Sequence, residues 1–172
     1  EVECLATSLL NMGLENKKIA VIGNNRYEWC VSYLAITTGN MIVVPLDKAL
    51  QEGEIRNLIQ TSNADVVIFE DKFAHVFEKI REEKNSNLKV FINIDLEKEQ
   101  NGVLSFQELV NKGCELISQG NDIYSKIVMD DNKMSILLFT SGTTSNSKAV
   151  MLSQKNIASN IYADIRFHIL AF

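Results

Sequence analysis

The chain has 172 residues and a mass of 19.4 kDa, which fits one domain with a sizeable hydrophobic core. Hydrophobic residues make up 46% and charged residues 23%, as in ordinary globular proteins. The 17 basic and 22 acidic residues give a net charge of −5, which argues against broad binding of nucleic-acid phosphates. No apolar run approaches the roughly 18 residues of a membrane span. We therefore expect neither a nucleic-acid partner nor a transmembrane segment, and the composition carries no signal for an oligomeric state.

Residues 19–23 form a short apolar run that predicts a buried strand. Asn25, with Glu28 three residues later, resembles a capping box and predicts a helix start. Gly39 predicts the end of that helix. One helix face carries Trp29, Tyr33 and Ile36.

Further apolar runs at 41–44, 66–69 and 88–92 predict three more strands, the first closed by Pro45, the only proline. The segments between them show helical spacing of apolar residues. These stripes consist of Ile55, Leu58 and Ile59 in one segment and of Phe73, Val76, Phe77 and Ile80 in the other. Continuous apolar strands that alternate with helices indicate a mostly parallel sheet covered on both faces. The first 95 residues or so therefore predict a doubly wound α/β unit.

The second half begins with a polar surface connection at 95–102. Ser105 and Glu108 form a capping-box pattern that predicts a helix, and Gly120 predicts its end. Apolar runs at 136–139 and 149–152 predict two more strands. Ser153 is placed to cap a last helix, whose apolar residues are Ile157, Ile161, Ile165 and Ile169.

The segment between these two strands, residues 140–148, holds six hydroxyl side chains, one glycine, one asparagine and one lysine. Hydroxyl groups donate hydrogen bonds without a fixed charge, and a turn at Gly142 lets backbone N–H groups converge on an anion. Lys148 adds a positive charge. A polyphosphate suits this set of groups, whereas a plain polar turn is the alternative interpretation of the same residues. The pattern differs from a Walker A loop, which would need glycine at Ser147 and a hydroxyl residue at Ala149.

The segment 138–152 resembles the phosphate-binding signature of the adenylate-forming enzymes, which include acyl-CoA synthetases, luciferases and peptide-synthetase adenylation domains. Their usual pattern is T-S-G-T-T-G-x-P-K-G, and six of its nine specified positions match here. The matching residues are Thr140, Ser141, Gly142, Thr143, Thr144 and Lys148. The departures are Ser145, Ser147 and Ala149.

The resemblance extends over essentially the whole chain. Residues 18–22 and the N-R-x-E-W pattern at 25–29 are similar to the first strand and helix of acyl-CoA synthetases, and that pattern favours the fatty-acyl branch. The resemblance implies a two-step ligase. A carboxylate attacks the α-phosphate of ATP to give acyl-AMP and pyrophosphate, and the CoA thiol then attacks the acyl carbon.

By this resemblance the ATP-binding residues are Thr140, Ser141, Gly142, Thr143, Thr144, Ser145 and Lys148. Thr144 is also the candidate contact for Mg²⁺. ATP, Mg²⁺, CoA and a fatty acid are the implied small molecules. The family's adenine, metal, acyl and catalytic-lysine motifs would follow residue 172, so we expect no catalytic residue in this chain.

Both ends of the chain fit a piece of a longer protein, because residues 1–10 have the pattern of a helix interior and residues 169–172 are apolar without a cap. We therefore expect residues 1–172 to be the N-terminal part of an AMP-binding domain, without the rest of that domain or the C-terminal domain. Two alternatives stay open: an adenylating enzyme that loads a carrier protein, and a non-enzymatic α/β interaction module.

The remaining candidate residues favour structural roles. Cys4, Cys30 and Cys114 are odd in number and widely spaced, and no secretory signal precedes them, so we expect reduced, buried thiols and a cytoplasmic protein. His75 and His168 have no metal-ligand spacing and are expected to be ordinary helix residues. The adjacent pair at 130–131 predicts an acidic loop.

Overall fold

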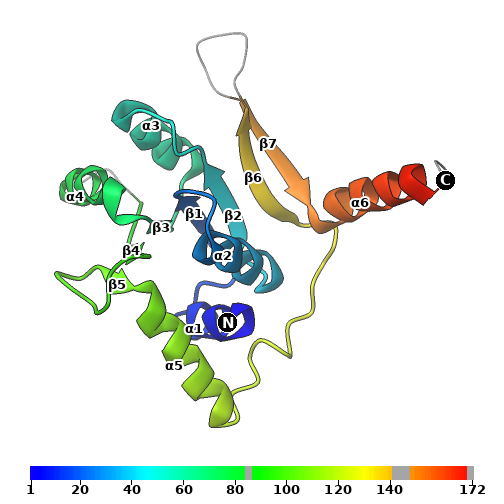
Figure 1. Cartoon of the computed structure of the whole chain (residues 1–172), viewed down its shortest axis with the longest axis horizontal. Coiled ribbons are helices and arrows are strands. Elements are labelled where there is room, and N and C mark those ends of the chain that lie inside the picture. Colours follow the sequence, from blue (N-terminus) through cyan, green and yellow to red (C-terminus); the bar gives the residue numbers. More distant parts are fainter. Residues whose placement is uncertain (84–86, 141–147, 170–172) are drawn as a thin grey trace.

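The computed structural model describes residues 1–83, 87–140 and 148–169, which form a twisted sheet with helices on both faces (Figure 1). The strands are β1 (Lys18–Ile22), β2 (Ile42–Leu46), β3 (Val66–Phe69), β4 (Val90–Asn93), β5 (Leu104–Ser105), β6 (Met134–Thr140) and β7 (Lys148–Ser153). Their order in the sheet is β5-β4-β3-β1-β2-β6-β7. All neighbouring strands pair in parallel except β6 and β7, which are antiparallel.

Five of the described helices cover the two faces of this sheet. They are α1 (Val2–Asn11), α2 (Tyr27–Thr38), α3 (Glu52–Ser62), α4 (Ala74–Glu82) and α5 (Phe106–Ser118), and a short 3₁₀ turn, η1 (Asp71–Phe73), precedes α4. One core joins α1, α2 and α5 to the side chains on one face of the strands, such as Val21 and Ile68. The other core joins α3 and α4 to the opposite face, where Phe69 and Phe77 pack with ring centroids 4.7 Å apart. The predicted doubly wound, mostly parallel α/β fold is therefore confirmed.

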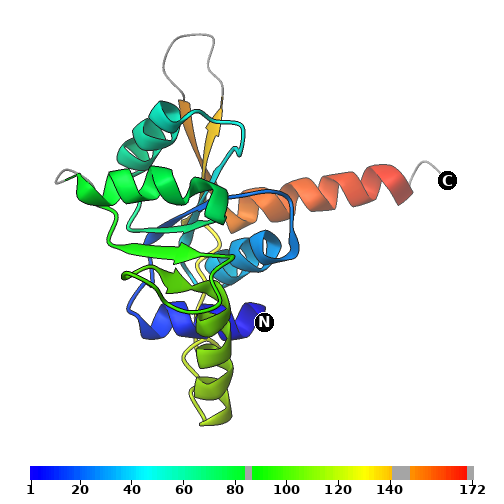
Figure 2. The ribbon, with the colours of Figure 1, turned by 60° about the vertical axis from the view of Figure 1, so that its left-hand side comes forward.

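The last described helix, α6 (Gln154–Ile169), has a different position. Figures 1 and 2 both show it extending away from the sheet beyond the end of β7. Its first turn is fixed to the body of the protein, because Gln154 donates to the backbone oxygen of Thr37 at 3.1 Å and Ile157 packs against the core of α1, α2 and α5. Ser153 accepts a hydrogen bond from the backbone of Asn156, as its predicted capping role requires.

The predicted apolar stripes of α3 and α4 are all buried, and α2 ends before Gly39 as expected. Several boundaries differ. Pro45 lies inside β2 rather than after it. The pairing of β2 with β6 is limited to Val43 and Ile136, so it does not include Pro45. The strand predicted at 88–92 begins at Val90, and the short strand β5 carries no periodic signal that could have predicted it.

The two predicted capping boxes also differ from expectation. The residue before α2 is Arg26 rather than Asn25, and it forms no side-chain cap; its guanidinium pairs with Glu28 instead. At α5, Ser105 caps the backbone of Glu108 as predicted. The Glu108 carboxylate, however, accepts from the backbone of Glu99 at 2.7 Å, so it anchors the preceding loop rather than completing the box.

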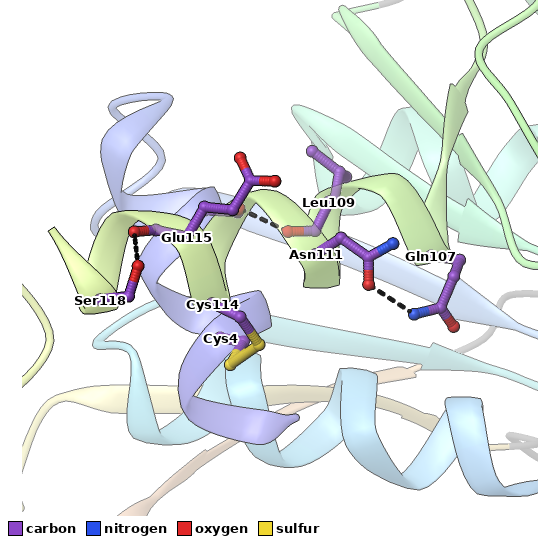
Figure 3. The surroundings of a disulfide bond; sticks show 8 residues. Cys4, Gln107, Leu109, Asn111, Cys114, Glu115 and Ser118 are labelled. Carbon is purple, nitrogen blue, oxygen red and sulfur yellow. Dashed lines mark hydrogen bonds between the residues drawn. A yellow bond between two sulfur atoms is a disulfide. The ribbon is translucent and has the colours of Figure 1, made fainter.

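The prediction of reduced thiols is wrong for Cys4 and Cys114 and correct for Cys30, whereas the prediction of burial is wrong for Cys30. Cys4 on α1 and Cys114 on α5 form a disulfide bond, shown in Figure 3, and Cys30 is an exposed free thiol. Sequence spacing could not reveal the pairing, because 110 residues separate the two partners and only the packing of α1 against α5 brings them together.

Hydropathy gives no membrane-spanning candidate in the described residues. No helix in these ranges is both long enough and apolar enough to cross a bilayer.

Candidate functional site

The predicted phosphate-binding segment lies at the end of an antiparallel hairpin. β6 enters the sheet in parallel with β2, and β7 returns along β6 with Thr140 opposite Lys148. Both residues are exposed, so neither contributes to the core. The hairpin therefore brings a hydroxyl group and an ammonium group to opposite sides of the segment that joins the strands.

The burial pattern of β6 shows where this strand leaves the core. Ser135, Ile136 and Leu137 are buried beside β2, whereas Leu138 and Thr140 are exposed. The strand thus begins in the core and ends outside it. The predicted strand on each side of the segment is confirmed, and because a strand rather than a helix begins at Lys148, the Walker A interpretation stays excluded.

The other predicted ATP-binding residues, Ser141, Gly142, Thr143, Thr144 and Ser145, lie outside the described residues. The structure thus places only Thr140 and Lys148 of the predicted set. The same holds for the candidate metal contact, Thr144. In the described ranges no group of three or more His, Cys, Asp or Glu residues is arranged to hold a metal ion.

A second polar cluster lies at the same edge of the sheet, where the parallel strands β1, β3 and β4 end. In doubly wound sheets this carboxyl edge is where ligands bind, at the point where the chain leaves neighbouring strands in opposite directions. Here that point lies between β1 and β3. Arg26, which follows β1, contacts Glu28 and Asp95 at 2.6 Å each and Glu70 at 3.7 Å. Its guanidinium thereby joins the loops that follow three strands.

The carboxylate of Glu70 is the most buried member of this cluster, with 7% of its side chain exposed. It also accepts a hydrogen bond from Asn24 at 2.9 Å and pairs with Lys72 at 3.3 Å. Gly23 fits closely beside it, since a Cβ atom at Gly23 would lie 3.1 Å from the Glu70 side chain. A buried carboxylate needs partners of this kind, because an unpaired buried charge is costly.

The cluster shifts the pKa values of Arg26, Glu28 and Asp95. The hydrogen bond from Arg26 lowers the pKa of Glu28 below its ordinary value of 4.5. Burial acts to raise the pKa of Asp95, but hydrogen bonds from the backbone of Asp71 and from Arg26 outweigh it and lower that pKa. The same partners raise the pKa of Arg26, led by its hydrogen bond with Glu28. Arg26, Glu28 and Asp95 therefore form an ionised group that links the loops.

The sequence pattern at 25–29 predicted a helix start and supported the family resemblance, but it did not predict this network. The signal that could have revealed it is the polar residue at or just after the end of each of three strands: Asn24 after β1, Glu70 after β3 and Asn93 at the end of β4. Of the two histidines, His75 lies on a helix as expected and contacts Glu52 at 2.9 Å from the neighbouring helix. The side chain of His168 lies outside the described residues.

Comparison with known proteins agrees with this geometry. Residues 1–170 match the AMP-binding enzyme family. Long-chain-fatty-acid–CoA ligase 5 of Rattus norvegicus is 31% identical over 179 residues, covering 96% of this chain and 25% of the rat protein. Long-chain-fatty-acid–CoA ligase 6 of Homo sapiens is 31% identical over 153 residues, covering 83% of this chain and 21% of the human protein.

The fold is also found among solved structures. The crystal structure of a long-chain-fatty-acid-CoA ligase from Archaeoglobus fulgidus superposes with a TM-score of 0.75 at 19% identity, covering 92% of this chain and 29% of that one. The chain thus spans about a quarter of the length of these relatives. Because the family match covers nearly all 172 residues, the chain belongs to the AMP-binding enzyme family.

Proposed function

We propose that this chain provides the ATP phosphate-binding part of an acyl-CoA synthetase that activates a fatty acid. The observation that carries the proposal is the hairpin, in which Thr140 and Lys148 face each other at the two ends of a hydroxyl-rich segment. An ammonium group and several hydroxyl donors suit the outer phosphates of ATP, since charge-assisted hydrogen bonds are the stronger ones. Residues 1–172 would then be the N-terminal part of an AMP-binding domain.

The reaction has two steps. A fatty-acid carboxylate oxygen attacks the α-phosphorus of ATP, the bond to the bridging oxygen breaks, and pyrophosphate leaves as acyl-AMP forms. The CoA sulfur then attacks the acyl carbon, AMP leaves, and the thiol proton is released. In the first step Lys148 and the hydroxyl groups would hold the β- and γ-phosphates and stabilise the charge that develops on the leaving group.

A magnesium ion would enter with ATP. Mg²⁺ is commonly bound by substrate phosphates and few protein ligands, so a single hydroxyl contact from Thr144 fits its chemistry. The ion would neutralise phosphate charge while the described residues orient the nucleotide.

The class of substrate is supported by the relatives, which are named as long-chain-fatty-acid–CoA ligases in rat and human. CoA is accordingly the proposed acceptor, and the cytoplasm is the proposed location. The length of the acyl chain is left to experiment.

The test compares two variants, Lys148→Ala and Lys155→Ala, in the protein encoded by the complete open reading frame. Lys155 serves as the control because it is an exposed lysine at the start of α6. Fatty-acid-dependent release of pyrophosphate is measured with ATP, Mg²⁺ and a panel of chain lengths. Removing the Lys148 charge should lower the adenylation rate at least tenfold, or about 1.4 kcal/mol, with little change in melting temperature. Lys155→Ala should retain the activity. Equal losses of activity and stability at Lys148 would contradict a role in phosphate binding.

The acceptor is tested separately, by supplying acyl-AMP with CoA or with a phosphopantetheinylated carrier protein. Thioester formation with CoA supports the proposal, and formation with the carrier alone would overturn the CoA assignment. If the protein encoded by the complete open reading frame releases no pyrophosphate with any acid tested, the result supports the alternative of a non-enzymatic module. The 172-residue chain alone should release none, because the described residues offer no recognisable site for adenine or the acyl chain.

A further inference from the structure

The packing of α1 against α5 holds two cysteines at one point. The Cα atoms of Cys4 and Cys114 are 4.8 Å apart, within the range that a disulfide requires. Gly113, the residue before Cys114, is buried directly against the backbone of Cys4. A Cβ atom at Gly113 would fall on the carbonyl group of Cys4, so only glycine permits this approach. A second contact involves Ser8, four residues after Cys4, and Leu109, four residues before Gly113. The Ser8 hydroxyl donates to the backbone oxygen of Leu109 at 2.6 Å.

The two bonded cysteine residues are not equally exposed. Cys114 on α5 is exposed, whereas Cys4 on α1 is partly buried. Figure 3 shows the bond between α1 and α5, on the turn of α5 where the exposed residue Glu115 follows Cys114. A thiol in solution can therefore reach the sulfur of Cys114 more easily than that of Cys4. Access of this kind governs thiol–disulfide exchange.

We propose that Cys4 and Cys114 form a reversible thiol–disulfide exchange site for low-molecular-weight thiols such as glutathione, with Cys114 as the residue that receives the thiol. This site is independent of the proposed ATP chemistry and lies on a different part of the fold, away from the carboxyl edge of the sheet. Its close geometry also involves contacts other than the sulfur–sulfur bond, because Gly113 packs against the backbone of Cys4 and Ser8 bonds to Leu109.

The exchange is balanced in two steps. The thiolate of Cys114 attacks glutathione disulfide, forms a mixed disulfide and releases one glutathione thiolate. The thiolate of Cys4 then attacks the Cys114 sulfur, closes the internal disulfide and releases the second glutathione. Overall two protein thiols are oxidised and one glutathione disulfide is reduced to two thiols. Opening runs through the same mixed disulfide in reverse.

The first experiment traps the mixed disulfide in the 172-residue chain carrying Cys30→Ser, which removes the exposed free thiol. Cys4→Ser leaves Cys114 alone, and Cys114→Ser leaves Cys4 alone. After treatment with glutathione disulfide, mass spectrometry measures the glutathione attached to each variant over time. We expect attachment to Cys114 to be about tenfold faster than attachment to Cys4. Equal rates would overturn the assignment of Cys114 as the receiving residue.

The second experiment tests whether helix packing sets the equilibrium. The oxidised fraction of the Cys30→Ser chain is measured by maleimide labelling in glutathione buffers of varied composition. Gly113→Ala forces α1 away from α5. It should lower the equilibrium constant for oxidation of the two thiols by glutathione disulfide at least tenfold. Gly53→Ala is the matched control, because a Cβ atom there meets nothing within 4 Å, and it should leave the constant unchanged.

Far-UV circular dichroism verifies that each variant keeps its helices. Two labelled thiols at every buffer composition would show that no internal disulfide forms and would refute the proposal. An equilibrium constant that is the same in Gly113→Ala and Gly53→Ala would refute the role of helix packing. A Gly113→Ala chain that fails to fold leaves the trapping experiment to decide.

Discussion

Arg26 links the segments that follow neighbouring strands of the sheet. Its guanidinium contacts carboxylates that follow β3 and β4 as well as one in its own helix, α2. Two of these carboxylates are about one-third exposed, so solvent weakens each separate ion pair. The contribution of Arg26 is therefore expected to come from the network, and mainly from Glu70, whose charge is buried.

The network predicts an acid-sensitive stability. The folded-state pKa values of Glu28 and Asp95 lie below their ordinary values of 4.5 and 3.8. As pH falls below about 4.5, the unfolded chain takes up protons before the folded chain does, so the free energy of unfolding falls. Arg26→Met should lower this free energy by about 1–2 kcal/mol at pH 7 and flatten its decline at acid pH.

Urea unfolding at pH 7 and at a series of pH values below 5 measures both effects. Lys126→Met is the control, because it removes an exposed pair with Asp122 and should cost less than about 0.5 kcal/mol. Parallel pH profiles for Arg26→Met and the unmodified chain would mean that the arginine does not set the two pKa values.

At the scale of elements, α1 contains two neighbouring buried hydroxyl residues with opposite surroundings. Ser8 is 2% exposed and bonded to Leu109, whereas the Thr7 hydroxyl is buried and has no hydrogen-bond partner among the described residues. A buried hydroxyl without a partner costs roughly 1–3 kcal/mol, whereas a formed hydrogen bond contributes roughly 1 kcal/mol. The two residues should therefore respond differently to removal of the hydroxyl.

We expect Thr7→Val, which keeps the shape of the side chain, to raise the free energy of unfolding by about 1 kcal/mol. Ser8→Ala should lower it by about the same amount. Chemical denaturation measures both, with Ser118→Ala as the control, because that hydroxyl is exposed and bonds only within α5. Loss of stability in Thr7→Val would show that its hydroxyl has a partner, such as a buried water molecule.

The helices also differ in how far the sequence could predict their contacts. The apolar positions of α3 and α4 recur every three or four residues, and this local pattern is enough to place the helices and their buried faces. The close approach at Gly113 and the bond from Cys4 to Cys114 depend on residues more than 100 positions apart. No local pattern encodes such contacts, so the sequence predicted reduced thiols where the structure has a disulfide.

The sequence could predict only those parts of the candidate site whose residues follow one another in the chain. The two strands of the β6–β7 hairpin and the intervening hydroxyl residues follow one another in the chain, so their pattern identifies the segment. The Arg26 network was not predictable in this way, because Asp95 lies 69 residues from Arg26 and meets it only through the order of the strands in the sheet. Contacts across strand ends follow from topology rather than from spacing.

At the scale of the whole molecule, the disulfide joins two distant parts of the chain. Cys4 and Cys114 enclose β1 to β5 and the helices between them, a loop with a sequence separation of 110 residues. The chain-entropy account assigns about 4.7 kcal/mol to closing a loop of roughly 100 residues in the unfolded state, and removal of natural disulfides typically costs about 2–5 kcal/mol. This constraint spans most of the described parallel sheet.

We therefore expect the double variant Cys4→Ser with Cys114→Ser to unfold at a lower temperature than the oxidised chain. For a chain of this size each 1 kcal/mol corresponds to roughly 2–4 °C, so the melting temperature should fall by roughly 5–15 °C. Differential scanning calorimetry measures the change, and Cys30→Ser, which removes a thiol without a bond, should melt like the original chain. Dithiothreitol should lower the melting temperature of the oxidised chain to that of the double variant and leave the double variant unaffected. A double variant that melts with the oxidised chain would mean that helix packing alone, through Gly113 and Ser8, holds α1 against α5.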